Sequence, residues 1–226
     1  MCGRFTLRTP TRDIVAVFQL DEAPDLSPRY NIAPTQLVAA VRLDAEHQTR
    51  ELVFLHWGLI PFWADDRKIG NRMINARAEG IATKPAFRQA FKSRRCLVVA
   101  DGFYEWQKTG GKKKLPYYVR LKEDLPFGFA GLWEHWKDED DTIESCTVIT
   151  TAANSLMQPI HDRMPVIVAP DDYALWLDPE FQDTHKLEDM LQPYDADQME
   201  AYPVSTVVNN PRNEMPACVE SVEPEA

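Results

Sequence analysis

The second half of the chain is a succession of short apolar runs of strand length, and this feature most limits the folds open to it. Each run alternates apolar with polar residues or is continuously apolar, which is typical of β-strands. Gly110 and Gly111, followed by three lysines, mark a hairpin loop between two of the runs. We therefore expect a mostly antiparallel, barrel-like β core. The runs lie at 95–100, 102–107, 116–122, 127–133, 143–151 and 165–169.

Helices are expected to be short and to flank this core. Thr9-Pro10 suits an N-cap followed by proline at the first helical position, with a helix ending near Leu20. The pattern predicts an α+β fold with one domain over 1–209 and a loose acidic tail over 210–226. The other expected elements are a loop at 21–36, paired strands at 37–43 and 51–57, helices at 84–94, 171–177 and 184–192, and a last strand at 201–208.

The composition limits where the protein works. With 226 residues and 44 % hydrophobic residues, the chain can bury a substantial core. It has no apolar run of about 18 residues and no secretory signal, so we expect no membrane association and a cytoplasmic protein. The four cysteines lack metal-ligand spacing, and no metal or cofactor is expected. Cys96 and Cys146 lie in apolar runs and are expected to be inert core residues.

The charge is unevenly distributed along the chain. The net charge is −10, which alone would disfavour nucleic acid as a partner. Residues 1–120, however, carry 20 Lys and Arg against 12 Asp and Glu, and residues 121–226 carry 5 against 23. A basic face in the first half could attract a polyanion, as a nucleic-acid-binding protein requires. The alternative is that the asymmetry only limits self-association.

The chain begins Met1-Cys2-Gly3-Arg4-Phe5, and Cys2 becomes the N-terminal residue if Met1 is trimmed. Cys2 then carries an amine and a thiol on adjacent carbons, which titrate near ~8 and ~8.5, so both are partly available as nucleophiles at neutral pH. Such an aminothiol condenses with an aldehyde to an imine, and the thiol then closes a five-membered thiazolidine. The alternative is a small apolar residue that starts a strand.

Three further stretches place polar residues at the ends of apolar runs. They are INARAE at 74–79, ADGFYEW at 100–106 and IHDRMP at 160–165. Polar groups at such positions are costly to bury unless they are paired, which makes them candidates for a functional site. Each stretch alone could be structural, with NAR and HDR forming ion pairs between strands.

Together with the N-terminus, these stretches form a set that resembles the SRAP family (SOS-response-associated peptidase), in its bacterial rather than its animal type. The resemblance extends from Met1 to about Asn209. It rests on eight motifs in this order: MCGRF, YNIAPTQ, WGLIPFW, INARAE, ADGFYEW, AGLWE, ITTAAN and IHDRMP.

The resemblance implies an abasic-site sensor and shield with lyase-like imine chemistry. Family members bind abasic sites in single-stranded DNA, and their N-terminal cysteine captures the ring-opened sugar as a thiazolidine, in a linkage that can reverse. It implies Cys2 as nucleophile and Asn75 as a polar anchor near the sugar and the amine. Glu105 is implied as the acid/base at the amine, and His161 as the group that helps to open the sugar ring.

The DNA contacts implied by the resemblance are of two kinds. Arg4, Arg77 and Arg163 each follow closely a proposed catalytic residue, as expected for ligands of the flanking phosphates. Trp63 and Trp106 are expected to stack on bases, although core packing is the alternative for both. Thr150, Asn31 and Pro165 complete the implied contacts.

Two other functions remain open at this stage. In the first, Cys2 is the nucleophile of a thiol (auto)peptidase with His161 as base and Glu105 as its orienting partner. In the second, the protein is a non-covalent damage-binding module in which Cys2 is incidental. We expect a monomer that associates with the nucleoid at damage sites. An intact mass would discriminate, because a retained Met1 blocks the amine.

Overall fold

Five strands close into a barrel at the centre of the protein. The structure is a computed structural model that describes residues 2–44, 46, 48–111, 114–138 and 141–223. The barrel strands are β3 (Leu37–Leu43), β4 (Arg50–Trp57), β6 (Arg95–Ala100), β9 (Phe127–Lys137) and β10 (Thr142–Ala152). They pair in the order β10, β4, β3, β6, β9, and β9 pairs again with β10 to close the ring. Only the β4–β10 pair is parallel. The predicted α+β domain with a mostly antiparallel, barrel-like core is confirmed.

A second sheet of five strands packs beside the barrel and contains the N-terminal strand. Its order is β13 (Met199–Pro203), β8 (Lys114–Leu121), β7 (Gly102–Lys108), β1 (Phe5–Leu7) and β2 (Arg29–Ile32). The chain passes from β6 to β7 through Asp101, and at Gly102 an added Cβ would lie 2.1 Å from the Tyr118 hydroxyl oxygen. Only glycine therefore allows β7 to pass this close to Tyr118.

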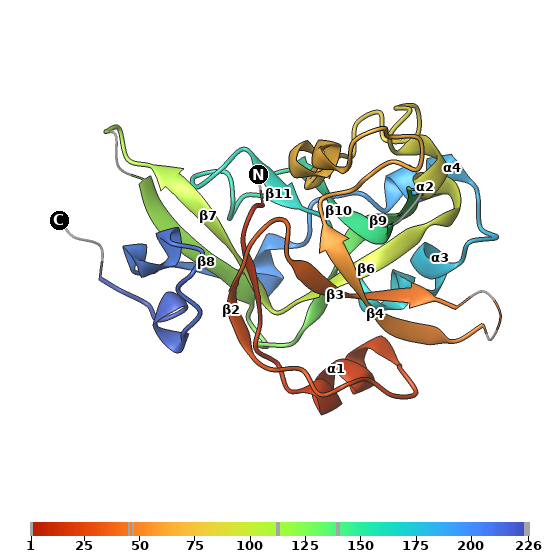
Figure 1. Ribbon diagram of the computed structural model, residues 1–226. Coiled ribbons are helices and arrows are strands. Elements are labelled where there is room, and N and C mark those ends of the chain that lie inside the picture. Colours follow the sequence, from red (N-terminus) through yellow and green to blue (C-terminus); the bar gives the residue numbers. More distant parts are fainter. Residues whose placement is uncertain (1, 45, 47, 112–113, 139–140, 224–226) are drawn as a thin grey trace.

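The remaining elements are short: three strands extend the barrel sheet, and the helices lie outside the two sheets, as Figure 1 shows. β5 (Asn75–Arg77) and β11 (Arg163–Pro165) both pair with β10, and β12 (Ile167–Val168) pairs with β9. The α-helices are α1 (Thr11–Phe18), α2 (Arg88–Ser93), α3 (Tyr173–Leu177) and α4 (Thr184–Asp189). The 3-10 helices are η1 (Arg67–Arg72), η2 (Pro170–Asp172), η3 (Ala196–Gln198), η4 (Thr206–Asn209) and η5 (Pro216–Cys218). None of the helices among the described residues has the length and apolar character needed to cross a bilayer.

Several predicted elements differ from the structure. The expected loop at 21–36 contains β2, whose polar residues pair with β1. The expected helix at 84–94 is confined to α2, and the run at 165–169 is divided between β11 and β12. The last strand is shifted to Met199–Pro203 and is followed by η4. Thr9 does not cap α1, because its hydroxyl donates instead to Asp101. Residues 112 and 113 of the predicted hairpin loop lie outside the described residues.

The prediction of a loose tail from residue 210 does not hold for residues 210–223. Cys218 is fully buried in a small cluster with Tyr104, Tyr118 and other apolar residues. Val204 forms a β-bridge with Ser221, and the Tyr202 hydroxyl donates to the Val219 carbonyl at 3.1 Å. Residues 224–226 lie outside the described part. The acidic composition of this segment misled the prediction, because its backbone and a few side chains make specific contacts.

Candidate functional site

The N-terminal strand carries Cys2 to the side of β7. Phe5 and Thr6 of β1 pair with Phe103 and Gly102, and the backbone continues this antiparallel register when Tyr104 N–H donates to the Arg4 carbonyl at 2.9 Å. Cys2 lies two residues before Arg4 and Glu105 lies one residue after Tyr104, so this pairing brings the two residues onto neighbouring stretches of the chain. Cys2 itself is fully buried.

Phe5 anchors this strand in the barrel. Its ring is fully buried, with its centroid 5.0 Å from that of Trp57 and 5.8 Å from that of Phe129. Removal of such a side chain typically costs about 3–5 kcal/mol of folding stability. The burial of Phe5 therefore fixes where the chain begins, and with it the position of Cys2.

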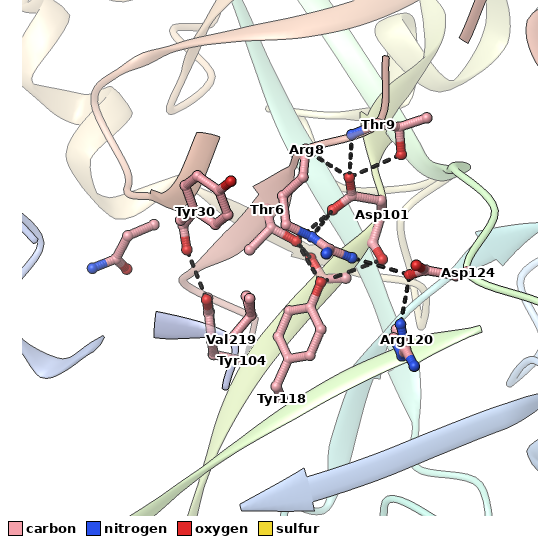
Figure 2. Close-up of polar contacts among 12 residues, drawn as sticks. Thr6, Arg8, Thr9, Tyr30, Asp101, Tyr104, Tyr118, Arg120, Asp124 and Val219 are labelled. Atoms are coloured by element: carbon pink, nitrogen blue, oxygen red, sulfur yellow. Dashed lines mark hydrogen bonds and ion pairs between the residues drawn. The ribbon is translucent and has the colours of Figure 1, made fainter. Parts of the chain in front are cut away.

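Asp101 fixes the other end of β1, as Figure 2 shows. The carboxylate is 1 % exposed and accepts hydrogen bonds from the Thr6 hydroxyl at 2.6 Å and from the Thr9 N–H and hydroxyl at 2.7 and 2.9 Å. It also accepts from the Arg8 N–H. The Thr6 hydroxyl is in turn 2.8 Å from the Tyr118 hydroxyl. A buried charge is tolerated because these donors compensate it. Sequence analysis placed Asp101 in a candidate motif but gave it no role.

The side chain of Asn75 contacts the Cys2 backbone. It lies on β5, which runs parallel to β10 with Asn75 opposite Val148. Its Nδ2 donates to the Cys2 carbonyl oxygen at 2.7 Å, whereas its Oδ1 is buried with no hydrogen-bond donor among the described residues. A buried acceptor without a partner is costly. The Asn75 amide is therefore positioned to accept a hydrogen bond from an amine or a sugar hydroxyl beside Cys2.

Glu105 is buried in the same region and acts on the Cys2 thiol. Its side chain lies on β7 and the residue is 3 % exposed. Burial, and secondly the Glu105 carboxylate, raise the pKa of the Cys2 thiol from 9.0 to about 12. The thiol is therefore protonated at neutral pH.

His161 precedes β11 and is partly exposed. Its Nδ1 accepts a hydrogen bond from the Arg163 N–H at 3.0 Å and lies 2.9 Å from Asp162 Oδ1. Nδ1 must be unprotonated to accept from Arg163 and protonated to donate to Asp162. Each protonation state of Nδ1 therefore allows only one of the two hydrogen bonds. In the neutral ring that accepts from Arg163, the proton is on Nε2. The contact with Asp162 is the weaker of the two, because the Asp162 side chain is 89 % exposed.

β10 connects the strand that carries Asn75 with the strand that follows His161. One edge of β10 pairs with β5, which carries Asn75, and the other pairs with β11, which follows His161. Cys2 joins them through its hydrogen bond with Asn75, and Glu105 through its effect on the thiol. A nucleophile, an amide, a carboxyl group and an imidazole are the groups that an addition to a carbonyl compound requires. In the described ranges, no three His, Cys, Asp or Glu residues are grouped as metal ligands.

The three proposed DNA-binding arginines differ in their environment. Arg77, on β5, is exposed and forms no ion pair or hydrogen bond among the described residues through its side chain. Arg163 is engaged: its guanidinium makes two hydrogen bonds to Glu79, at 2.6 and 2.9 Å, and one to the Thr150 carbonyl at 2.6 Å. This pair lowers the pKa of Glu79. It involves Arg163 of HDR, as the ion-pair alternative expected, but its partner Glu79 lies two residues beyond NAR and β5.

Arg4 is half-buried and packs against Trp106. Its Nη1 donates to Asn31 Oδ1 at 2.6 Å and to the Val208 carbonyl at 2.9 Å. The guanidinium carbon is 5.7 Å from the centroid of the Trp106 ring, whose Nε1 donates to Asn209 Oδ1 at 2.7 Å. Arg4 and Trp106 therefore belong to one wall of the site, next to Cys2.

The other candidate DNA contacts divide into exposed and buried residues. Trp63 is 48 % exposed on the irregular loop after β4, and its neighbour Phe62 is 56 % exposed. Sequence analysis did not select Phe62, although it lies in the same aromatic motif. Thr150, Asn31 and Pro165 are buried, so their side chains support the site rather than line its surface.

Comparison with known proteins identifies the class to which this fold and site belong. The family described as SOS response associated peptidase (SRAP) matches residues 1–211. The chain belongs to the SRAP family, as the motifs predicted.

Its relatives include two proteins of Bacillus subtilis (strain 168) that are named abasic site processing proteins. YoqW is 47 % identical, and the match covers 98 % of this chain and 100 % of YoqW. YoaM is 48 % identical, and the match covers 94 % of this chain and 95 % of YoaM. A solved structure of a protein from Bacteroides thetaiotaomicron has a TM-score of 0.87 and 26 % identity, and the match covers 98 % of this chain and all of the other.

Proposed function

We propose that this protein processes abasic sites in single-stranded DNA by forming a covalent adduct through Cys2 after removal of Met1. The observation that supports this most directly is the contact between Asn75 and the Cys2 backbone, which fixes a potential aminothiol beside a buried carboxyl group. The names of the Bacillus relatives support abasic sites as the substrate.

The proposed reaction begins at the sugar. An abasic deoxyribose is mostly a closed hemiacetal, and His161 donates a proton to the ring oxygen as the C1′ hydroxyl loses its own proton to water. This opens the ring to an aldehyde at C1′. The Asn75 amide accepts a hydrogen bond at this position and holds the sugar against the chain terminus. Such positioning converts a slow bimolecular condensation to an effectively unimolecular step.

The neutral amine of Cys2 then attacks C1′, and the resulting carbinolamine loses water to give an imine. Glu105 delivers the proton that leaves with this water and later accepts one, so a single carboxyl group serves both steps. The thiol sulfur adds to the imine carbon, its proton is transferred to the nitrogen, and a thiazolidine closes. The net change is loss of one water for each aldehyde captured. The thiol is protonated at rest because its pKa is about 12, so the amine reacts first.

DNA would be held on both sides of the site. Arg77 is exposed as a ligand for phosphate, and Trp63 is exposed for stacking on a base, which is tolerant of sequence. Arg4 contributes a further cation two residues from the nucleophile. A strand bound in this way would be shielded at the lesion.

The test is covalent capture. The protein, with removal of Met1 confirmed by intact mass, is incubated with three single-stranded oligonucleotides of one sequence: abasic, undamaged, and with a tetrahydrofuran that lacks the aldehyde. We expect a shifted species on a denaturing gel with the abasic strand alone. Binding of all three without covalent capture would instead support the non-covalent damage-binding module.

A thiol peptidase is less consistent with the site. A peptidase nucleophile acts as a thiolate, usually one whose pKa is lowered by its neighbours. Burial and Glu105 instead raise the pKa of Cys2. Cleavage of a peptide substrate that disappears in Cys2→Ala would overturn this preference.

A further inference from the structure

The segment 206–218, here called the C-terminal strap, makes contacts with the strands that carry the site. It contains η4 and η5 and follows the last of the eight motifs, IHDRMP. Trp106, on β7, donates to its Asn209 side chain. It also makes hydrogen bonds with β2 and with Arg4, which precedes β1.

Asn31 connects the strap to Arg4. It is fully buried on β2, and its Nδ2 lies within hydrogen-bonding distance of three strap carbonyls, those of Val208 at 3.2 Å, Asn210 at 3.0 Å and Asn213 at 2.9 Å. Its Oδ1 accepts from Arg4 Nη1 at 2.6 Å, and the same nitrogen donates to the Val208 carbonyl. Arg4 and the strap therefore hold each other in place through one buried amide.

Glu214 fastens the strap to β2. Its Oε1 accepts from the main-chain N–H groups of Tyr30 and, at 2.8 Å, Asn31. Its Oε2 is 3.0 Å from Arg29 Nε. Because β2 is an edge strand of its sheet, these N–H groups face away from the other strands. Glu214 thus satisfies the edge of β2 at the residue that binds Arg4.

The Arg4 guanidinium is left with one available end. Nη1 makes both of its hydrogen bonds, and Nε is buried. Nη2 donates to no acceptor among the described residues. Unlike Nε, it is not buried. The strap therefore fixes the orientation of the guanidinium and leaves Nη2 open to a ligand beside Cys2.

We propose that Glu214 is a positioning residue for DNA binding: through Asn31 and the strap it orients Arg4 so that Nη2 meets a phosphate of the bound strand next to the abasic nucleotide. This inference rests on the proposed function, because it takes DNA as the ligand. A cation fixed before binding loses less conformational entropy when the phosphate arrives.

The direction in which DNA affinity changes when Glu214 is removed distinguishes a positioning role from a general electrostatic effect of its charge. Glu214 carries a negative charge near a site for a polyanion, so its removal should strengthen DNA binding if charge alone mattered. Loss of the Arg4 position should instead weaken binding. Glu220 provides a matched control, because it lies six residues further along, is exposed, and makes no hydrogen bond or ion pair among the described residues.

The experiment measures the affinity of Glu214→Ala, Glu214→Gln and Glu220→Ala for undamaged single-stranded DNA across a salt series. We expect Glu214→Ala to bind about fivefold to tenfold more weakly, with a salt slope reduced by roughly 0.7, the contribution of one phosphate. Glu220→Ala should bind as tightly as the wild type or more tightly. Glu214→Gln should stay close to the wild type, because one carbonyl oxygen can still accept both N–H groups.

Melting temperatures are measured in parallel, and affinities are compared at a temperature where every variant is folded. If Glu214→Ala binds as tightly as Glu220→Ala, the inference is wrong, whatever its melting temperature. Capture of abasic DNA by the wild type is scored separately. Weakened binding by Glu214→Ala together with no capture by the wild type would overturn the proposed function while leaving the role of Glu214 intact.

Discussion

Asn75 holds the Cys2 backbone through a 2.7 Å hydrogen bond from Nδ2 to the carbonyl oxygen, while its Oδ1 is buried without a donor among the described residues. Asn75→Ala removes both the anchor and the acceptor. Loss of such contacts costs about 1–3 kcal/mol, which corresponds to a rate of adduct formation about 5- to 150-fold lower. The rate is measured in single turnover at saturating abasic DNA. An unchanged rate would show that Asn75 positions nothing that the reaction needs.

The Cys2 thiol should be unreactive until the pH is strongly alkaline. Burial raises its pKa from 9.0 to about 12, so the thiolate fraction grows tenfold per pH unit across the neutral range and beyond pH 9. We expect iodoacetamide to alkylate Cys2 at a rate that still rises between pH 9 and pH 11, measured by peptide mass. An ordinary exposed thiol would level off near pH ~9. A plateau below pH 9 would contradict the burial of Cys2.

The raised pKa of the Cys2 thiol also makes the folding stability depend on pH. Because the native state retains the Cys2 proton to about pH 12 and the unfolded state loses it near 9.0, this contribution to stability is present below pH 9.0 and is lost as the pH rises towards 12. Cys96 behaves alike, since burial also raises its pKa to about 12.

Substitution by alanine should have different effects at Arg77 and at Arg163. Arg77→Ala should reduce the salt slope of single-stranded DNA binding by roughly 0.7 without changing the melting temperature, because its side chain is exposed and is proposed to contact only phosphate. Arg163→Ala should lower the melting temperature, by about 2–4 °C for each kcal/mol lost, because Glu79 and the Thr150 carbonyl lose their donor. The reverse pattern would exchange the two roles.

Glu105 and His161 should control different steps. Glu105→Gln keeps the shape of the side chain but cannot shuttle a proton, so it should slow condensation about 10²- to 10⁴-fold. His161→Gln should slow the opening of the sugar ring, and its defect should shrink on a substrate whose aldehyde is already open. Because the thiazolidine opens by the reverse steps, both variants should also release the adduct slowly. Capture at the wild-type rate by both variants would make these residues structural.

The barrel could be predicted from the sequence because its strands are long and either alternate apolar with polar residues or are continuously apolar. β6 is buried along its entire length, and its run of apolar residues predicted it to the residue. β1, β2 and β5 were missed because they have three or four residues each. Such short strands are fixed by their partners rather than by a pattern of their own.

The candidate site was predicted only as a set of motifs, and its connections could not be. Arg163 and Glu79 are 84 residues apart, and Asn31 and Asn213 are 182 apart. No local pattern indicates which polar residues meet across such separations. This is why the sequence selected Arg163 and Asn31 as DNA contacts, whereas the structure engages one in an ion pair and buries the other.

The central claim is that the Cys2 amine and thiol both bond to C1′. It is tested most directly by the stability of the adducts of wild type and Cys2→Ser, heated under denaturing conditions with and without prior borohydride. Cys2→Ser retains the amine, so it should give an imine that survives only after reduction, whereas the wild-type adduct should persist without reductant. A heat-stable, unreduced Cys2→Ser adduct would contradict the thiazolidine.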